Sequence, residues 1–102
     1  MATAFITGSA RGIGAAIALR LAKDGFDIAF NDISEKMFED NDILDRVRAL
    51  GVQAEVFLAD VSKYDQCEAM VNAVKERFGT IDVLVNNAGI TRDNLMARMD
   101  EA

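Results

Sequence analysis

Proline and histidine are absent from the 102 residues of this sequence, and Cys67 is its only cysteine. A single cysteine excludes an internal disulfide and fits a reducing compartment, so we expect a cytoplasmic protein. Without proline, and without any low-complexity tract, no stretch has the composition of an interdomain linker. We therefore expect residues 1–102 to form one domain.

Long hydrophobic runs and an excess of basic residues are absent too. No run of 18 or more apolar residues occurs, so we expect no membrane span. The first strand is expected within a few residues of Met1, which leaves no room for a signal peptide. The net charge of −6 argues against nucleic acid or an anionic membrane as the main partner. A small anionic ligand stays compatible, because it needs only local hydrogen-bond donors.

The most informative feature that is present is a glycine-rich segment near the start of the chain. Residues 3–14 read TAFITGSARGIG, and an alanine- and leucine-rich stretch follows them. This order predicts a strand, a tight turn and a helix, which bring backbone N–H groups and a helix N-terminus to one point. Such a point suits a phosphate group.

Each glycine of this segment has a physical reason. Gly8 would let the chain leave the strand in a conformation that a side chain disfavours. Gly12 would let the backbone approach a pyrophosphate, and Gly14 would let the helix press against the sheet. The spacing is G-x-x-x-G-x-G, which is neither the older G-x-G-x-x-G dinucleotide fingerprint nor a P-loop. A glycine-rich turn without a ligand therefore stays an open alternative.

Strands and helices are predicted to alternate along the rest of the chain. We expect strands at residues 4–6, 26–30, 53–58 and 81–85. The helix after each of the first three strands should end at a glycine, namely Gly25, Gly51 and Gly79.

The buried face of each predicted helix is read from apolar residues three or four positions apart. In the first helix this face comprises Ile13, Ile17 and Leu21, widened by Ala18 and Ala22. The second helix should begin after an N-cap at Ser34 and bury Leu44, Val47 and Leu50. Before the third helix, Ser62 and Asp65 resemble a capping box, and the buried residues are Cys67, Val71, Val74 and Phe78.

This alternation predicts an α/β fold, a doubly wound parallel sheet of the Rossmann type with helices over both faces. Right-handed crossovers would give the strand order 3-2-1-4. In such a sheet a ligand binds beyond the carboxyl ends of the strands, at the switch point between strands 1 and 4. The four strand ends carry glycine or polar residues, at positions 8–14, 32, 60–61 and 87–89.

Three motifs at these strand ends resemble the short-chain dehydrogenase/reductase family. They are TGSARGIG after the first strand, DV after the third and NNAG after the fourth, and the resemblance covers the whole chain. The stretch NNAGITRDNLMARM is similar to the 3-oxoacyl-(acyl carrier protein) reductase branch. The Asn31-Asp32 end of the second strand is more similar to diacetyl/acetoin reductases.

The resemblance implies a role for each motif residue in holding a nicotinamide dinucleotide. The diphosphate and its ribose would be lined by Gly8, Ser9, Arg11, Gly12, Ile13 and Gly14. The adenosine ribose would meet Asp32 and Ile33, and the adenine would meet Asp60 and Val61. The ribose on the nicotinamide side would lie over Asn87, Ala88 and Gly89, with Asn87 also tying neighbouring strands together. For Asp60 the alternative is helix approach and capping, and for Asn86 we favour a structural role.

The chemistry of that family depends on a serine, a tyrosine and a lysine four residues after the tyrosine, all beyond NNAG. The only tyrosine here is Tyr64, and Glu68 stands where the lysine would be. We therefore name no catalytic residue and no metal ligand. We expect the cofactor-binding half of an NAD(P)-dependent carbonyl reductase or alcohol dehydrogenase, inactive without its C-terminal half. The alternative is a non-catalytic dinucleotide-binding module or a minimised fold fragment.

Two charged residues bear on the choice of cofactor. A carboxylate at Asp32 accepts hydrogen bonds from the ribose hydroxyls of NAD. Against the 2′-phosphate of NADP it is repulsive, by about 1 kcal/mol in water and about 4 kcal/mol at a protein surface. Arg11 favours NADP, but an exposed arginine contributes less than about 1 kcal/mol unless its contact is bidentate. We therefore expect NAD rather than NADP.

The fourth strand raises the question of partners. In the order 3-2-1-4 the strand at residues 81–85, IDVLV, is an apolar edge without lysine or proline. Such an edge invites pairing with another chain. We expect it to self-associate or to need the missing C-terminal half, and we expect the full-length parent to be a homo-oligomer.

Overall fold

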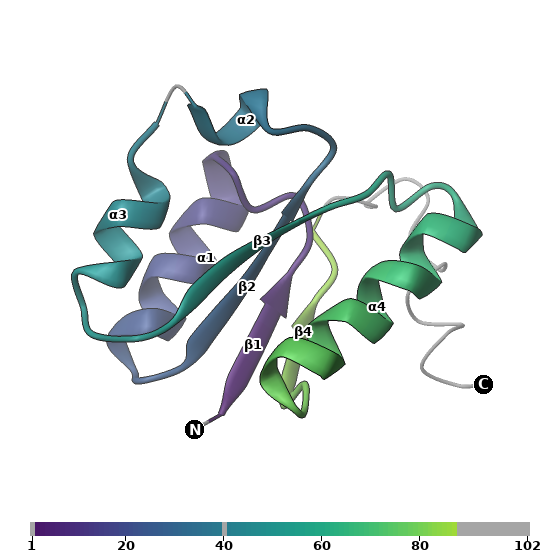
Figure 1. Ribbon diagram of the computed structural model, residues 1–102. Helices are drawn as coiled ribbons and strands as arrows, with labels where there is room; N and C mark the ends of the chain where they lie inside the picture. The colour runs from purple at the N-terminus through teal and green to yellow at the C-terminus, as the bar shows by residue number, and fades with distance from the viewer. Residues whose placement is uncertain (1, 40, 88–102) are drawn as a thin grey trace.

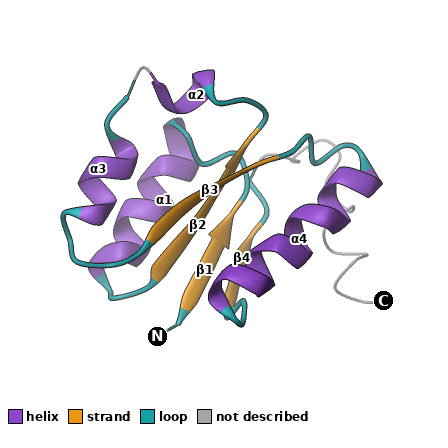
Figure 2. Cartoon of the chain, in the orientation of Figure 1, coloured by secondary structure: helices purple, strands orange, loops and turns teal. Residues whose placement is uncertain are grey.

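The computed structural model describes residues 2–39 and 41–87, and it contains the predicted parallel sheet with helices on both faces (Figures 1 and 2). The strands are β1 (Thr3–Ile6), β2 (Asp27–Asp32), β3 (Ala54–Leu58) and β4 (Val83–Val85). The helices are α1 (Gly12–Lys23), α2 (Lys36–Glu39), α3 (Ile43–Arg48) and α4 (Tyr64–Phe78). The α/β fold class is confirmed.

The strand order is β3-β2-β1-β4, as the sequence predicts. All three pairings are parallel, and Ala4 of β1 lies opposite both Ile28 of β2 and Val83 of β4. The chain therefore reverses its direction of strand addition between β1 and β4, which places the switch point there. Because the strands are parallel, their carboxyl ends meet at one edge of the sheet (Figure 1).

Two apolar cores lie on opposite faces of this sheet. On one face Ile6 and Phe30 pack with Ala18 of α1 and Val47 of α3. On the other face Phe5, Ala29 and Ala59 pack with a stripe of α4, namely Cys67, Met70 and Val74. Residues that follow one another in β1 thus point to different cores, and both are fully buried. Within residues 2–39 and 41–87, no helix has the length and apolar character that crossing a membrane requires.

The buried face of α1 differs from the predicted one. Its centre is formed by the small residues Gly14, Ala18 and Ala22, whereas Ile17 and Leu21 are only partly buried at its flank. Ile13, which we expected on this face, is 71% exposed. The reason is the short distance between helix and sheet, which leaves room only for small side chains along the line of contact. The apolar periodicity therefore located the helix correctly and its closest face incorrectly.

The single helix predicted between Ser34 and Gly51 is two short helices, α2 and α3. Ile43 and Val47 are buried, Leu44 is partly buried, and Leu50 is 43% exposed rather than part of the core. The N–H of Ile43 donates to the side-chain oxygen of Asn41 at 3.0 Å, so a new helix begins there. Before this break, Phe38 of α2 packs edge-to-face on Phe30 of β2.

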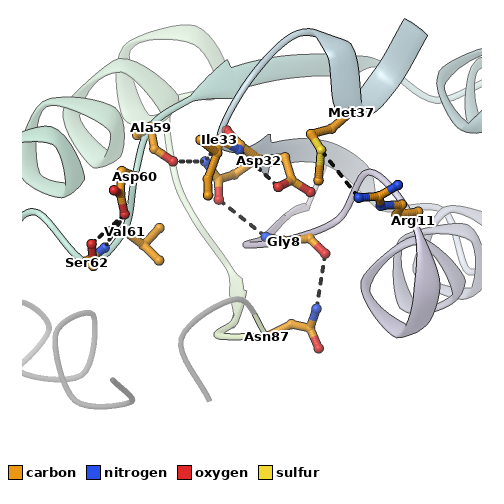
Figure 3. A pocket seen from close by; sticks show the side chains of 11 residues that line it. Gly8, Arg11, Asp32, Ile33, Met37, Ala59, Asp60, Val61, Ser62 and Asn87 are labelled. Atoms are coloured by element: carbon orange, nitrogen blue, oxygen red, sulfur yellow. Dashed lines mark hydrogen bonds between the residues drawn. The ribbon is translucent and has the colours of Figure 1, made fainter. Parts of the chain in front are cut away.

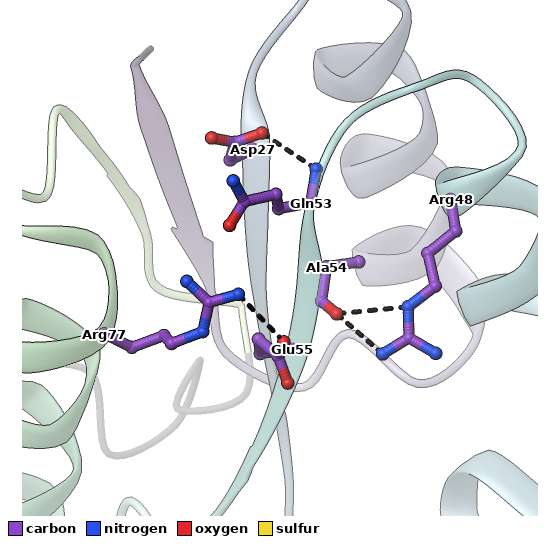
Figure 4. A network of polar contacts seen from close by, with 6 residues as sticks. All are labelled: Asp27, Arg48, Gln53, Ala54, Glu55 and Arg77. Carbon is purple, nitrogen blue, oxygen red and sulfur yellow. Dashed lines mark hydrogen bonds and ion pairs between the residues drawn. The ribbon is translucent and has the colours of Figure 1, made fainter.

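Polar contacts cover the start of β3, which is an edge strand among the described residues (Figure 4). Asp27 accepts the N–H of Gln53 at 2.8 Å, and Arg48 donates to the carbonyl of Ala54 through Nε and Nη2 at 3.2 and 2.7 Å. Glu55 pairs with Arg77 of α4 at 3.1 Å. These contacts hold β3 in register and occupy a carbonyl that an edge strand would otherwise expose.

The closest approach of helix to sheet is at Gly14. A Cβ there would lie 2.9 Å from the Nδ2 of Asn87 and closer still to the backbone oxygen of Gly8. The Gly8 oxygen belongs to the backbone, and the amide of Asn87 is held by its hydrogen bond to that same oxygen, so a Cβ would displace both. The predicted role of Gly14 in close helix–sheet packing is therefore supported by the geometry.

We expect Gly14→Ala to lower the free energy of unfolding by about 1–3 kcal/mol, the usual cost of overpacking. Helix propensity alone has the opposite sign and would raise it by about 1 kcal/mol. Chemical denaturation of both proteins checks the sign. Ala16→Gly, at an exposed position of the same helix, measures the propensity alone. A stabilised Gly14→Ala variant would contradict the close approach.

Candidate functional site

A cavity of about 330 Å³ lies beyond the carboxyl ends of the strands (Figure 3). Predicted site residues from all four strand ends line it, namely Gly8, Arg11, Asp32, Ile33, Asp60, Val61 and Asn87. The lining is completed by residues that we had not predicted as site residues, namely Asn31, Met37, Ala59 and Ser62. The four segments that we expected to share one edge of the sheet therefore do so.

The glycine turn leads into a helix N-terminus that has no capping side chain and no acidic residue in its first turn. Gly8 has a positive φ of 60°, the conformation for which a glycine was expected. Gly12 also has a positive φ, and nothing lies within 4 Å of where its Cβ would be. No side chain caps α1, and its first turn holds no acidic residue, unlike those of α3 and α4. Its first N–H groups have no intrahelical acceptors, so this end of the helix attracts an anion.

Asp32 holds the turn and lines the cavity at once. Its Oδ2 accepts the N–H of Ala10 at 3.2 Å, and its Oδ1 accepts the N–H of Ile33 at 3.0 Å. A carboxylate oxygen can accept a second hydrogen bond, so each oxygen keeps acceptor capacity toward the cavity. The carboxylate is therefore fixed in direction by the backbone and still able to receive hydroxyl donors.

In the cavity lining, Arg11 lies on the other side of Asp32 from Asp60 (Figure 3). It is the residue before α1, and its Nη2 is 3.7 Å from the sulfur of Met37 in α2. Arg11 is exposed, so its guanidinium brings a positive charge to the rim of the cavity.

Asp60 is engaged within its own turn. Its Oδ1 accepts the N–H of Ser62 at 3.0 Å and the hydroxyl of Ser62 at 2.6 Å. These two hydrogen bonds lower the pKa of the Asp60 carboxyl below its usual value, and the bond from the hydroxyl has the larger effect. The predicted capping box between Ser62 and Asp65 is wrong. The hydroxyl of Ser62 donates to Asp60, which precedes it, and Lys63 stands before α4 without capping the helix through its side chain. These contacts fit the helix-approach role that we left open for Asp60, and because Asp60 also lines the cavity, its contact with an adenine stays a prediction.

Asn87 joins the ends of β4 and β1. Its Nδ2 donates to the carbonyl of Gly8 at 3.1 Å, and its N–H donates to the hydroxyl of Thr7 at 3.0 Å. The expectation that Asn87 ties neighbouring strands is confirmed. Asn86 lies 3.4 Å from the same hydroxyl, in keeping with a structural role. Ala88 and Gly89, which were assigned to the nicotinamide side, lie outside the described residues.

Comparison with known proteins identifies the family of the chain. The family model for the short chain dehydrogenases matches residues 2–102. The chain belongs to this family. A 3-oxoacyl-(acyl-carrier-protein) reductase of Staphylococcus aureus is 44% identical over 99 residues, and nodulation protein G of Azospirillum brasilense is 44% identical over 100 residues. Each comparison covers 97% of this chain and 40% of the relative. The short-chain dehydrogenase chain described here thus spans well under half the length of these curated relatives.

Solved structures of other short-chain dehydrogenases have the same fold. A 3-oxoacyl-(acyl-carrier protein) reductase from Brucella melitensis, in complex with NAD, is 42% identical with a TM-score of 0.77, covering 86% of this chain and 33% of that one. A metagenomic short-chain oxidoreductase in complex with NADP is 35% identical with a TM-score of 0.78, covering 87% and 39%. Because similar proteins hold NAD or NADP, these likenesses do not choose between the two cofactors.

Asn31 is a residue of this short-chain dehydrogenase chain whose role the sequence analysis missed. It is buried, its Oδ1 accepts the N–H of Gly8 at 3.3 Å, and its Nδ2 donates to the carbonyls of Phe57 and Ala59 at 3.0 and 3.2 Å. One side chain thus joins the glycine turn to the end of β3. The available signal was a polar residue directly after an apolar strand, which we noted only as part of a resemblance.

Two predicted site residues have surroundings that differ from those expected. Ser9 is fully buried, and its hydroxyl donates to the carbonyl of Ile6 at 2.8 Å and accepts the N–H of Asn31 at 2.9 Å. It braces β1 against β2, so a contact of its side chain with a ligand would require these bonds to break. Ile13 is exposed in the first turn of α1 but does not line the cavity. Contacts of either residue with a cofactor stay predictions.

We expect Ser62→Ala to raise the pKa of the Asp60 carboxyl toward its usual value, because the largest cause of the lowered pKa is removed. Ser62→Thr keeps a hydroxyl and should keep the pKa low. A lowered pKa in the folded state contributes stability at neutral pH that is lost as the pH falls through that pKa. The stability difference between wild type and Ser62→Ala should therefore shrink in acid. Titration of the carboxyl carbon by NMR measures the pKa, and an unchanged midpoint in Ser62→Ala would refute the assignment.

Proposed function

We propose that this chain is the dinucleotide-binding portion of an oxidoreductase, which transfers a hydride between a nicotinamide cofactor and a carbonyl or alcohol substrate. One observation carries the proposal. The acid-free N-terminus of α1 and the Asp32 carboxylate lie side by side, joined by the hydrogen bond from Ala10 to Asp32. The first attracts a diphosphate and the second accepts ribose hydroxyls, and adenosine diphosphate presents the two groups in that order.

The remaining lining residues fit the rest of such a ligand. Ile33 is 66% exposed at the cavity, and Val61 lines it from the end of β3, so the two offer apolar contacts to an adenine ring. Asn87 lies past Gly8 on the β4 side, in keeping with the predicted position of the second ribose. When bound, the nicotinamide would supply or accept the hydride; the residues of this chain bind and orient it.

We propose NAD rather than NADP as the cofactor, because of the fixed carboxylate of Asp32. Two backbone N–H groups hold this carboxylate in place, so it cannot swing away from a 2′-phosphate. The repulsion between this carboxylate and the 2′-phosphate amounts to about 1–4 kcal/mol, whereas the attraction of an exposed arginine contributes less than about 1 kcal/mol. Arg11 is such an arginine, and its described contact is with the sulfur of Met37.

Calorimetric titration with NAD and with NADP tests both parts of this proposal. We expect the dissociation constant for NADP to exceed that for NAD by roughly fivefold or more, the equivalent of the smaller repulsion above. Asp32→Ala should weaken the binding of NAD and strengthen the binding of NADP, so the ratio of the two dissociation constants should approach one or invert. Glu76→Ala removes one negative charge at an exposed position of α4 and serves as the matched control. Tighter binding of NADP by wild type would disprove the cofactor assignment, and binding of neither would disprove the function.

The activity of a longer parent protein is inferred from its relatives. The likeness to 3-oxoacyl-(acyl-carrier-protein) reductases suggests a ketoacyl or related carbonyl substrate. The 102 residues contain one tyrosine, Tyr64, which is 46% exposed at the start of α4 with Glu68 one turn on. No lysine stands at that position to help the phenol act as a general acid. A non-catalytic dinucleotide-binding module is therefore the second candidate for the chain by itself.

Assays with NADH and a diketone or ketoacyl substrate distinguish the two candidates. We expect the isolated chain to bind NADH without oxidising it, because no described residue supplies the proton that the carbonyl oxygen must receive. Absorbance of NADH with and without the chain measures the turnover. Oxidation that depends on the chain alone would show that an acid exists which we have not identified. The partner of the β4 edge, the homo-oligomeric parent and the cytoplasmic location stay predictions.

A further inference from the structure

Asn41, between α2 and α3, forms hydrogen bonds with three separate segments. Its Nδ2 donates to the carbonyl of Met37 in α2 at 2.8 Å, and to the carbonyl of Ala10 in the glycine turn at 2.9 Å. Its Oδ1 accepts the N–H of Ile43 at the start of α3 at 3.0 Å. Asn41 does not line the cavity, and its side chain reaches the glycine turn from 31 positions away in the sequence.

These partners determine both the orientation and the identity of the side chain. Two carbonyls require donors and one N–H requires an acceptor, so the amide of Asn41 can face them in only one way. Aspartate could accept from Ile43 but could not donate to Ala10 or Met37. Alanine could do neither. The three bonds can therefore be separated by substitution.

The bond to Ala10 acts on the start of α1. The planar peptide between Ala10 and Arg11 points its C=O and its N–H in opposite directions, so fixing the oxygen also fixes the Arg11 N–H. Arg11 has extended backbone angles, and α1 begins at the next residue. On the other side of Ala10, its N–H is held by Asp32 at 3.2 Å. The turn is thus held from β2 through Asp32 and from α2–α3 through Asn41.

The bond to Met37 acts on a wall of the cavity. Met37 lines the cavity and contacts the guanidinium of Arg11 at 3.7 Å (Figure 3). Asn41 therefore holds the backbone of two residues whose side chains meet over the rim, one directly and one through Ala10. Without it, the α2 wall and the glycine turn lose their shared hydrogen-bond donor.

We propose that Asn41 is a positioning residue of the dinucleotide site, which orients the Ala10–Arg11 peptide and so aims the first turn of α1 at the diphosphate. The inference rests on the proposed function and deepens it, because it adds a residue outside the cavity to those that set the affinity. A positioned donor costs no reorganisation when the ligand arrives, and this is the origin of the expected gain in affinity.

Three variants test the proposal: Asn41→Ala, Asn41→Asp and the control Asn72→Asp. Asn72 is exposed on α4 away from the cavity lining, so its substitution adds the same charge as Asn41→Asp. Measurements of NADH binding at about 0.5 M salt screen that charge. We expect both Asn41 variants to bind NADH about three- to tenfold more weakly than wild type, the worth of one neutral hydrogen bond.

Melting temperature and amide exchange separate positioning from stability. Asn41→Asp keeps the acceptor for Ile43 but loses both donors, and Asn41→Ala loses all three hydrogen bonds, so both should melt lower than Asn72→Asp. In the ligand-free protein, amides of residues 11–14 should exchange faster in both Asn41 variants and at the wild-type rate in Asn72→Asp. A role in stability alone predicts that both variants bind NADH as tightly as Asn72→Asp when binding is measured well below their melting temperatures, where they are folded.

The outcomes discriminate between this inference and the proposed function. Weaker NADH binding by Asn41→Asp at a temperature where it is fully folded, with faster exchange at residues 11–14, supports the positioning role. Binding as tight as that of Asn72→Asp, or unchanged exchange, overturns it. If wild type itself binds no NADH, the proposed function fails, and the exchange data alone then decide whether Asn41 holds the turn.

Discussion

The two hydrogen-bonding groups of Gly8 are held from opposite sides, and the arrangement of the site depends on this. Asn31 at the end of β2 accepts its N–H, and Asn87 after β4 donates to its carbonyl. Gly8 follows the central strand β1, so these bonds join the ends of three neighbouring strands. The left-handed conformation of Gly8 turns the chain toward α1 at this point. Gly14 then passes so close to Gly8 and Asn87 that only hydrogen fits between them.

This arrangement gives the edge of the sheet two chemically different ends. Toward α1 there are helix N–H groups without a capping side chain, and the first turn of the helix holds no acidic residue. Toward β2 there is a carboxylate held by two backbone N–H groups. The overall charge of −6 does not oppose an anionic ligand here, because local dipoles act at contact distance while distant charges are screened. A diphosphate beside a ribose has the complementary pattern.

Membership of the short-chain dehydrogenases accounts for the fold and the cavity, but the relatives are much longer than this chain. Among the described residues, the cavity has a floor of strand ends and a wall from α2, with the β4 side formed by Asn87. The strand order predicted from the sequence correctly indicated which strand ends converge. The family resemblance assigned Ser9 to the ligand, and this contact stays a prediction. In the ligand-free fold the hydroxyl of Ser9 holds β1 and β2 together.

The sequence alone determined the alternating elements, the order of the strands and the cavity residues Asp32, Asp60 and Asn87, because these follow from local periodicity and from the rules of parallel sheets. It did not show that α1 faces the sheet through Gly14, Ala18 and Ala22, since periodicity reports which residues are apolar and not how close the sheet lies. Nor did it show the roles of Asn31 and Asn41. Their partners lie 23 and 31 positions away in the glycine turn. Only the folded chain brings those donors and acceptors within hydrogen-bond distance.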